Sequence, residues 1–151
     1  MSLESKIMDQ LKQAMRDKNE VALRTLRAIK AAILNEKTAA GAKEEMTEAD
    51  ELKLLQKLSK SRKDSLEIFR TQNREDLAVK EEEEIAVIDQ FLPKQLTEIE
   101  LEDIVKTVIQ DLGATSPADM GKVMGAASKK LAGQADGRLI SETVKRLLAA
   151  Q

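Results

Sequence analysis

Glycine and basic side chains are concentrated in residues 119–138, whose sequence is DMGKVMGAASKKLAGQADGR. Gly121 and Gly125 are four residues apart, so a helix would place both on one face. A face without side chains lets another backbone approach closely, and neighbouring cationic groups attract phosphate. The basic residues that could make phosphate contacts here are Lys122, Lys129, Lys130 and Arg138. The same glycine spacing also suits two tightly packed helices, and packing is the interpretation that the spacing alone favours.

The sequence contains no cysteine and no histidine. It therefore excludes thiol nucleophiles, disulfides, zinc sites built from Cys and His, and acid–base catalysis by histidine. Phe69 and Phe91 are the only aromatic residues, which argues against a module that stacks nucleic-acid bases on aromatic rings. Carboxylates and lysines remain as candidate catalytic groups.

Charge is distributed unevenly along the chain. The formal net charge of the whole chain is −2, whereas residues 112–151 carry a net charge of +3. This basic excess surrounds the glycine-rich stretch and favours an anionic partner. No run of about 18 apolar residues predicts a membrane span, and the first ten residues lack the pattern of a signal peptide. We therefore expect a cytoplasmic protein that does not enter a membrane.

Helical periodicity extends along the whole chain, which is rich in alanine, leucine, lysine, glutamate and glutamine. Ser2 and Asn19 can cap the first two helices. Residues 38–45 are small and polar, and they predict a flexible loop. Thr47 resembles the first residue of a capping box, and it opens the longest helix, which extends to about Gln72.

The sequence predicts an ion pair between two of these helices. Arg62 falls in the middle of the apolar stripe of the longest helix, and an unpaired buried charge is strongly destabilising. In the next helix, expected over residues 75–92, Glu81 and Glu84 also lie on the apolar stripe. An antiparallel hairpin that turns at Asn73 places Arg62 opposite Glu84, with Glu81 as the nearest substitute. Structural ion pairs commonly produce this pattern, so a structural role is favoured over a catalytic one.

Pro93 stops the fourth helix, so the segment from Leu92 to Leu96 is the predicted domain boundary. Three shorter helices follow. The residues that predict their starts are Thr97, Ser116 and Asp136, and the glycines that end the first two are Gly113 and Gly133. The predicted fold is all-α, with a four-helix N-terminal domain that contains a long helical hairpin, residues 1–92, and a three-helix C-terminal domain, residues 97–151.

Several separated motifs resemble one known family in their order along the chain. The segment DMGKVMGAASKKLAGQADGRLISETVKRLL resembles the C-terminal signature of the GatB/YqeY family. Upstream, SRKDSLEIF, NREDLAVKEEEEI and FLPKQL resemble N-terminal segments of YqeY-like proteins, so the resemblance covers essentially the full length. Asn73 stands where that family is expected to have glycine, and asparagine also tolerates the left-handed backbone.

The resemblance implies an all-helical protein whose C-terminal domain is similar to the tail of the B subunit of the tRNA-dependent amidotransferase. In that enzyme the tail helps to grip tRNA, while catalysis takes place elsewhere. The positions that match the family are Gly121, Lys122, Gly125, Gly133, Asp136 and Gly137. No Ser-Ser-Lys amidase signature and no Walker A loop are present. No cofactor and no metal are expected.

Three functions remain open at this stage. The leading hypothesis is a noncatalytic protein that binds tRNA or assists aminoacyl-tRNA metabolism, beside an aminoacyl-tRNA synthetase or an amidotransferase. Lys122, Lys129, Lys130 and Arg138 are the candidates for phosphate contacts, the glycines for close approach or packing, and Asp136 for helix capping. One alternative is a carbon–nitrogen ligase or amidase-like enzyme that uses glutamine as amido donor. Another is a helical adaptor that binds proteins through its N-terminal helices.

Overall fold

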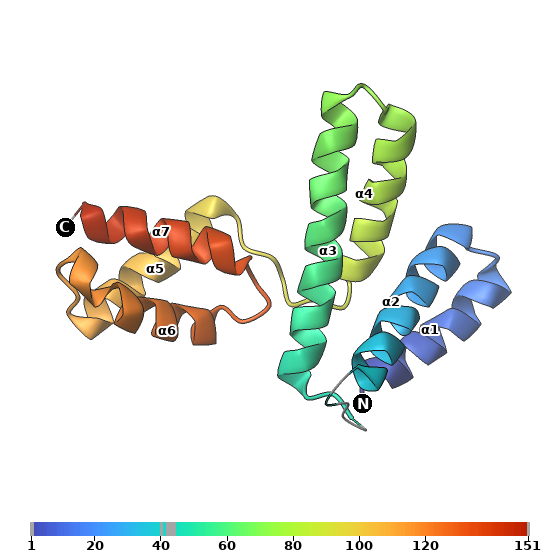
Figure 1. Ribbon diagram of the computed structural model, residues 1–151, viewed down its shortest axis with the longest axis horizontal. Coiled ribbons are helices and arrows are strands. Elements are labelled where there is room, and N and C mark those ends of the chain that lie inside the picture. The colour runs from blue at the N-terminus through green and yellow to red at the C-terminus, as the bar shows by residue number, and fades with distance from the viewer. Residues whose placement is uncertain (1, 40, 42–44, 151) are drawn as a thin grey trace. The chain divides into compact units, whose positions relative to one another are not determined.

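The computed structural model describes residues 2–39, 41 and 45–150, and within these ranges the protein is helical, without strands (Figure 1). The chain divides into two compact units, Met1–Leu92 and Pro93–Gln151. Each unit has its own cluster of buried apolar side chains. The all-α class predicted from the sequence is confirmed.

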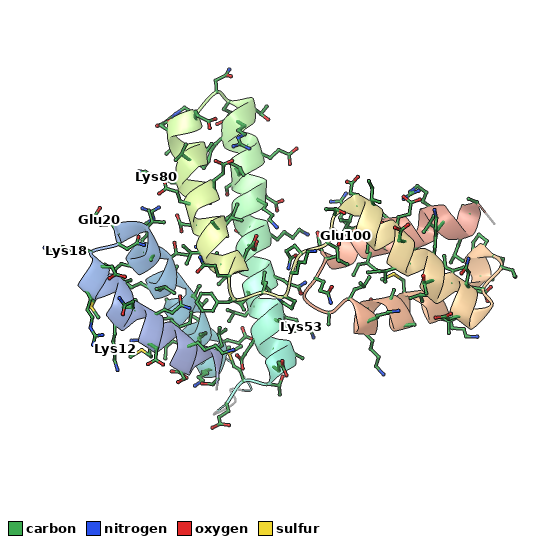
Figure 2. All side chains as sticks on the ribbon, turned by 180° about the vertical axis from the view of Figure 1, so that it is seen from behind. Lys12, Lys18, Glu20, Lys53, Lys80 and Glu100 are labelled. Carbon is green, nitrogen blue, oxygen red and sulfur yellow. The ribbon has the colours of Figure 1, made fainter. Side chains whose placement is uncertain are left out.

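The first unit begins with two helices, α1 (Leu3–Asp17) and α2 (Glu20–Thr38). Ser2 caps α1 by accepting a hydrogen bond from the backbone N–H of Ser5, and Asn19 caps α2 in the same way. Between them, Lys18 adopts a left-handed backbone with φ of 54° at the turn (Figure 2). Both helix starts agree with those predicted from the sequence.

A long hairpin follows, made of α3 (Glu48–Thr71) and α4 (Glu75–Asp89). Thr47 and Asp50 form the predicted capping box at the start of α3, because each side chain accepts a hydrogen bond from the other's backbone N–H. Asn73 has φ of 57° at the hairpin turn, so it adopts the left-handed backbone that the sequence predicts there.

Two details of this unit differ from the sequence prediction or lie outside it. The helix expected over residues 75–92 ends at Asp89, and the N–H groups of Phe91 and Leu92 instead bond to carbonyls three residues earlier. The tighter turn arises because the residue before a proline disfavours the helical backbone. Of the flexible loop expected at residues 38–45, residues 40 and 42–44 lie outside the described part, and Thr38 still belongs to α2.

The core of the first unit lies between the α1–α2 pair and the end of the hairpin that is remote from its turn at Asn73. Ile7 of α1, Ile29 of α2, Leu55 of α3 and Ile88 of α4 are almost completely buried in one cluster. α2 packs on both α3 and α4, so it joins the first pair of helices to the second.

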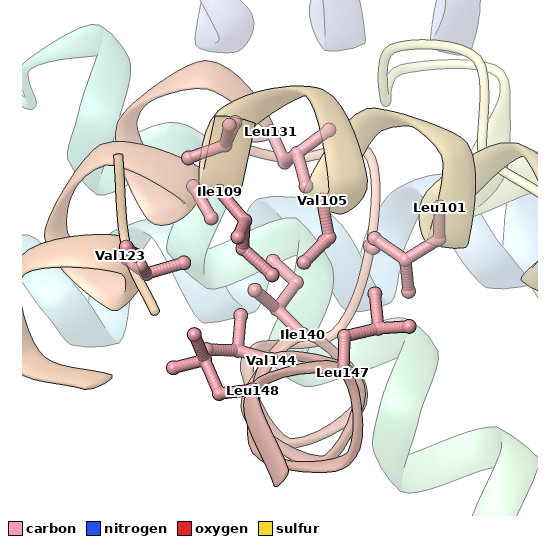
Figure 3. Close-up of a cluster of buried hydrophobic side chains, with 13 residues drawn as sticks. Leu101, Val105, Ile109, Val123, Leu131, Ile140, Val144, Leu147 and Leu148 are labelled. Carbon is pink, nitrogen blue, oxygen red and sulfur yellow. The ribbon is translucent and has the colours of Figure 1, made fainter. Parts of the chain in front are cut away.

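The second unit contains α5 (Glu98–Leu112), the short 3-10 turn η1 (Pro117–Asp119), α6 (Met120–Lys130) and α7 (Gly137–Ala149). The sequence predicted one helix from Ser116 onward, and the structure instead opens it with the separate turn η1. Figure 3 shows the buried side chains that α5, α6 and α7 contribute to the core. The cluster includes Val105, Val123, Ile140, Val144 and Leu148.

The segment that the sequence placed between the two domains is bonded to the second unit. The side chain of Gln95 donates hydrogen bonds to the carbonyls of Pro93, at 2.9 Å, and Gly133, at 2.7 Å. The N–H of Leu96 donates to the carbonyl of Gln134 at 3.0 Å. Residues 93–96 are thus held against the turn between α6 and α7. Among the helices of the described residues, none has the length and apolar character needed to span a membrane.

Candidate nucleic-acid interface

Asp119 precedes α6 directly, and its carboxylate belongs to the capping box of the η1 turn. Its carboxylate accepts hydrogen bonds from the backbone N–H groups of Thr115, at 3.0 Å, and Ser116, at 3.3 Å. These hydrogen bonds, helped by the positive charge of Lys122, lower the pKa of Asp119 below its usual value. The Asp119 carboxylate therefore holds the η1 turn from which α6 continues.

Gly121 and Gly125 lie on the exposed side of α6, away from the buried residues Val123 and Ala127. A Cβ atom added to either glycine would meet no neighbouring group within 4 Å among the described residues. Within the second unit, no other helix therefore packs closely on these two glycines. The packing side of α6 is the opposite one, where Val123 and Ala127 contact α5 and α7.

Lys122 and Lys129 share the exposed side of α6 with the two glycines. Seven residues of α-helix bring Lys129 to within about 20° of Lys122 around the axis and about 10 Å along it. Lys130 is also exposed, but it lies about 80° from Lys122 around the helix, near the edge of the buried stripe. Within the described part of the chain, none of the three lysines forms an ion pair.

Arg138 differs from the lysines because it already has a partner. Its Nε lies 3.1 Å from Oε1 of Glu142, one turn further along α7, and its side chain is 77% exposed. An exposed pair of this kind contributes little to stability, so a phosphate could replace the carboxylate. Asp136 accepts a hydrogen bond from the N–H of Arg138 at 3.2 Å and caps α7, as its position in the sequence predicts.

The two remaining glycines of the motif have different surroundings. Gly133 has φ of 77°, a left-handed backbone that favours glycine, in the turn after α6; the helix itself ends at Lys130, three residues before the glycine at which the sequence predicted its end. Gly137 is the first residue of α7. Among the described residues, no neighbouring group lies within 4 Å of a Cβ added at Gly137. The hydrogen bond from Gln95 to the Gly133 carbonyl could not be predicted from the sequence, because Gln95 lies in a linker, where no helical periodicity indicates which side chains make contacts.

In the first unit, the predicted ion pair is formed. Nε of Arg62 lies 3.2 Å from Oε1 of Glu84, and the two side chains are only 18% and 16% exposed. Arg62 also donates to the carbonyl of Leu58 at 3.1 Å. A second cation, Arg24 of α2, lies 3.4 Å from Oε2 of Glu84. Glu84 therefore links three helices, and the sequence missed Arg24 because it does not interrupt an apolar stripe.

The other carboxylate of this region, Glu81, has a raised pKa. Burial is the main cause, and the negative charge of Glu84 adds to it, while Arg62 and Arg24 oppose it. No group of three or more acidic side chains among the described residues is arranged to hold a metal ion. The arrangement of Glu84 between two arginines is that of a structural ion-pair network.

The exposed side of α6 combines two properties that suit a polyanion. Lys122 and Lys129, which form no ion pair among the described residues, lie beside the helix backbone that is uncovered at Gly121 and Gly125. Ammonium groups at this separation can contact separate phosphates of a nucleic-acid backbone, and the missing side chains leave room for close approach. We refer to Gly121, Lys122, Gly125 and Lys129 as the α6 face.

Comparisons with known proteins agree with the resemblance seen in the motifs. The family model described as Yqey-like protein matches residues 4–148. A protein of Pyrenophora tritici-repentis, named altered inheritance of mitochondria protein 41, mitochondrial, is 40% identical over 99 residues, which cover 64% of this chain and 54% of that protein. An uncharacterised protein of Schizosaccharomyces pombe is 34% identical over 98 residues, covering 65% of this chain and 78% of that protein.

The present chain spans about half the length of the Pyrenophora relative, so that protein contains further sequence. The family match extends over both compact units, from α1 to α7. On this evidence of sequence and fold, the chain belongs to the family of YqeY-like proteins.

Proposed function

We propose that this protein binds tRNA without catalysing a reaction on it, and that it assists aminoacyl-tRNA metabolism beside an amidotransferase or an aminoacyl-tRNA synthetase. The observation that carries the proposal is the α6 face. Glycine inside a helix costs about 1 kcal/mol relative to alanine, and a Cβ at either glycine would meet no other group of the second unit within 4 Å. A ligand whose backbone lies close to the helix would explain why glycine occupies both positions.

The charge distribution supports the same proposal. The C-terminal region from residue 112 carries a net charge of +3 in a chain whose net charge is −2. The scarcity of aromatic residues favours contacts to phosphates and recognition of tRNA shape over stacking of bases. The expected compartment is the cytoplasm. The name of the Pyrenophora relative places that protein in mitochondria, and both compartments contain tRNA.

The test is binding of unfractionated tRNA to the full chain at several salt concentrations. The wild type should bind with an affinity that falls steeply with salt, because released counterions drive the association. The variant Lys122→Ala/Lys129→Ala/Lys130→Ala should bind at least about tenfold more weakly and with a shallower salt slope.

A matched control removes the same charge from α3 of the other unit, in the variant Lys53→Ala/Lys57→Ala/Lys63→Ala. These three lysines are exposed and form no ion pair among the described residues. The control should bind tRNA within about twofold of the wild type if the basic region of α6 is the site. Wild-type protein that shows no salt-dependent binding, or an α6 variant that binds as well as the control, would refute the proposal.

A further inference from the structure

Exposed apolar side chains are concentrated on the first two helices. Of the six large apolar side chains that are exposed in the described residues, three lie there: Met8 is 37% exposed, Met15 54% and Leu34 60%. Half-buried Leu23 follows the same side of α2 as Leu34. This apolar surface has no role in the proposed binding of tRNA by the second unit.

The contacts of α1 and α2 identify which of their sides face the rest of the first unit. Lys6 and Gln10 of α1 line a cavity together with Phe91, so that side of α1 is turned towards α3 and α4. On α2, Arg24 reaches Glu84 of α4. On α1, Met8 and Lys12 lie on the opposite side of the helix from Lys6 and Gln10, and Lys12 is seen there in Figure 2. On α2, Leu23, Lys30 and Leu34 lie about 80–120° around the helix from Arg24 and about 100–140° from the buried Ile29, so they belong to its exposed side.

Helical spacing assembles one stripe on each of these two sides. On α1, Glu4, Met8, Lys12 and Met15 follow one another at steps of four, four and three residues, so they share one stripe. On α2, the same spacing joins Leu23, Arg27, Lys30, Leu34 and Lys37. An ion pair between Glu4 and Lys37 bridges the two stripes at one end. The stripes are therefore neighbours, and we refer to them together as the outer face.

The outer face is basic as well as apolar. Its cations Lys12, Arg27 and Lys30 are exposed, and within the described part of the chain none of them forms an ion pair. Lys12 lies between Met8 and Met15 within one stripe, and Arg27 and Lys30 lie between Leu23 and Leu34 within the other. Apolar and positive groups thus alternate turn by turn along both helices.

We propose that the outer face binds an acidic amphipathic helix of a partner protein. The alternation of charge and apolar surface matches a helix that alternates apolar and carboxylate side chains along one side. Methionine adapts its shape to such partners. A membrane surface fits less well, because a helix lying in a bilayer keeps its cations beside the apolar stripe and not within it. A nucleic acid would leave the apolar side chains exposed.

The experiment is selection from a displayed library of helical peptides about 20 residues long on the full-length protein. The expected result is enrichment of peptides with apolar residues at positions i, i+3, i+4 and i+7 and with Asp or Glu beside them. The best peptide is then measured by fluorescence anisotropy. Its affinity should fall at least about tenfold with Met8→Gln/Met15→Gln and with Lys12→Glu/Arg27→Glu, because a few central residues dominate helix docking.

The control variant is Ile68→Gln/Lys63→Glu, which changes one exposed apolar residue and one lysine of α3, away from the outer face. It should bind the peptide as the wild type does, and circular dichroism should show that all variants remain folded. Selection without an acidic amphipathic consensus, or equal loss of affinity in the control, would overturn the proposal.

Three further measurements would assign the outer face to another partner and so would also overturn it. The first is binding of vesicles of phosphatidylcholine and phosphatidylglycerol that is lost in Met8→Gln/Met15→Gln. The second is a dimer in sedimentation that dissociates in the same variant. The third is tRNA binding that depends on Lys12 and Arg27. The proposed tRNA site on α6 is tested separately, so failure of one proposal leaves the other intact.

Discussion

Gly125 sits in the middle of α6 with open space where a side chain would project. Gly125→Ala should raise the free energy of unfolding by about 0.5–1 kcal/mol, because alanine favours the helix and meets no obstacle. The same methyl group should weaken tRNA binding by holding the phosphate backbone away from the helix. Urea unfolding and fluorescence anisotropy measure the two effects. A variant that is more stable and binds tRNA as well as the wild type would show that close approach does not explain the glycine.

Glu84 holds two arginines from different helices, so its removal should be costly. Glu84→Ala leaves the half-buried Arg62 without its carboxylate, and we expect a loss of about 1–3 kcal/mol in the free energy of unfolding. The double variant Arg62→Met/Glu84→Leu should recover much of this loss, since an apolar pair needs no charge partner. If Glu84→Ala unfolds at the same urea concentration as the wild type, the network is not a stabilising link.

Individual residues were predictable where one pattern dominated. Arg62 interrupts an apolar stripe, so its need for a partner could be inferred from periodicity, and the antiparallel geometry then selected Glu84. The spacing of Gly121 and Gly125 shows that the two glycines share one face of a helix, but it does not show whether another helix of the second unit covers that face. Arg24 lies on a third helix, whose contact with α4 depends on tertiary packing.

Among the elements, three helix ends use the same backbone geometry with different residues. After α1, α3 and α5, the N–H groups of Asn19, Arg74 and Ala114 bond to carbonyls five residues earlier, and the residue before each of them has positive φ. That residue is Lys18, Asn73 and Gly113 in turn. The shared geometry predicts a graded response to substitution.

Lys18→Gly should stabilise the protein by about 1 kcal/mol, because it removes the steric cost of a left-handed backbone at a residue with a Cβ. Asn73→Gly should gain less, since asparagine tolerates this conformation better, and Gly113→Ala should lose about 1 kcal/mol. Thermal and urea unfolding of the three variants measures the order. Equal effects at Lys18 and Asn73 would show that side-chain contacts, and not backbone strain, determine the ends of these helices.

The starts of the helices were more predictable than their ends. Ser2, Asn19, Thr47, Thr97 and Asp136 all cap the helices that they were expected to cap, because capping depends on a few adjacent residues. The early end of α4 and the separate turn η1 arise from how Pro93 and Pro117 alter local bonding. Proline marks such a change in the sequence without specifying the length of the turn that results.

For the whole molecule, the extent of the C-terminal domain can be tested directly. The sequence predicts a domain of residues 97–151, whereas Gln95 and Leu96 make hydrogen bonds to Gly133 and Gln134. A fragment of residues 93–151 should therefore fold, and it should be more stable than residues 97–151 by about 1–3 kcal/mol, since each bond contributes about 1 kcal/mol. Urea unfolding followed by circular dichroism compares them. Equal stability of the two fragments would show that the hydrogen bonds of Gln95 and Leu96 do not stabilise the C-terminal domain.

The central claim is that the α6 face binds tRNA. The most direct test compares two variants of the second unit that each lose two positive charges, one on the α6 face and one elsewhere. Lys122→Ala/Lys129→Ala alters the α6 face, whereas Lys94→Ala/Lys145→Ala removes two exposed lysines of the second unit that lie outside α6. At low salt the first variant should bind tRNA about tenfold more weakly than the wild type, equal to about 1.4 kcal/mol, and the second should lose less than about threefold. Equal losses would mean that net charge alone attracts tRNA, and they would contradict a site on the α6 face.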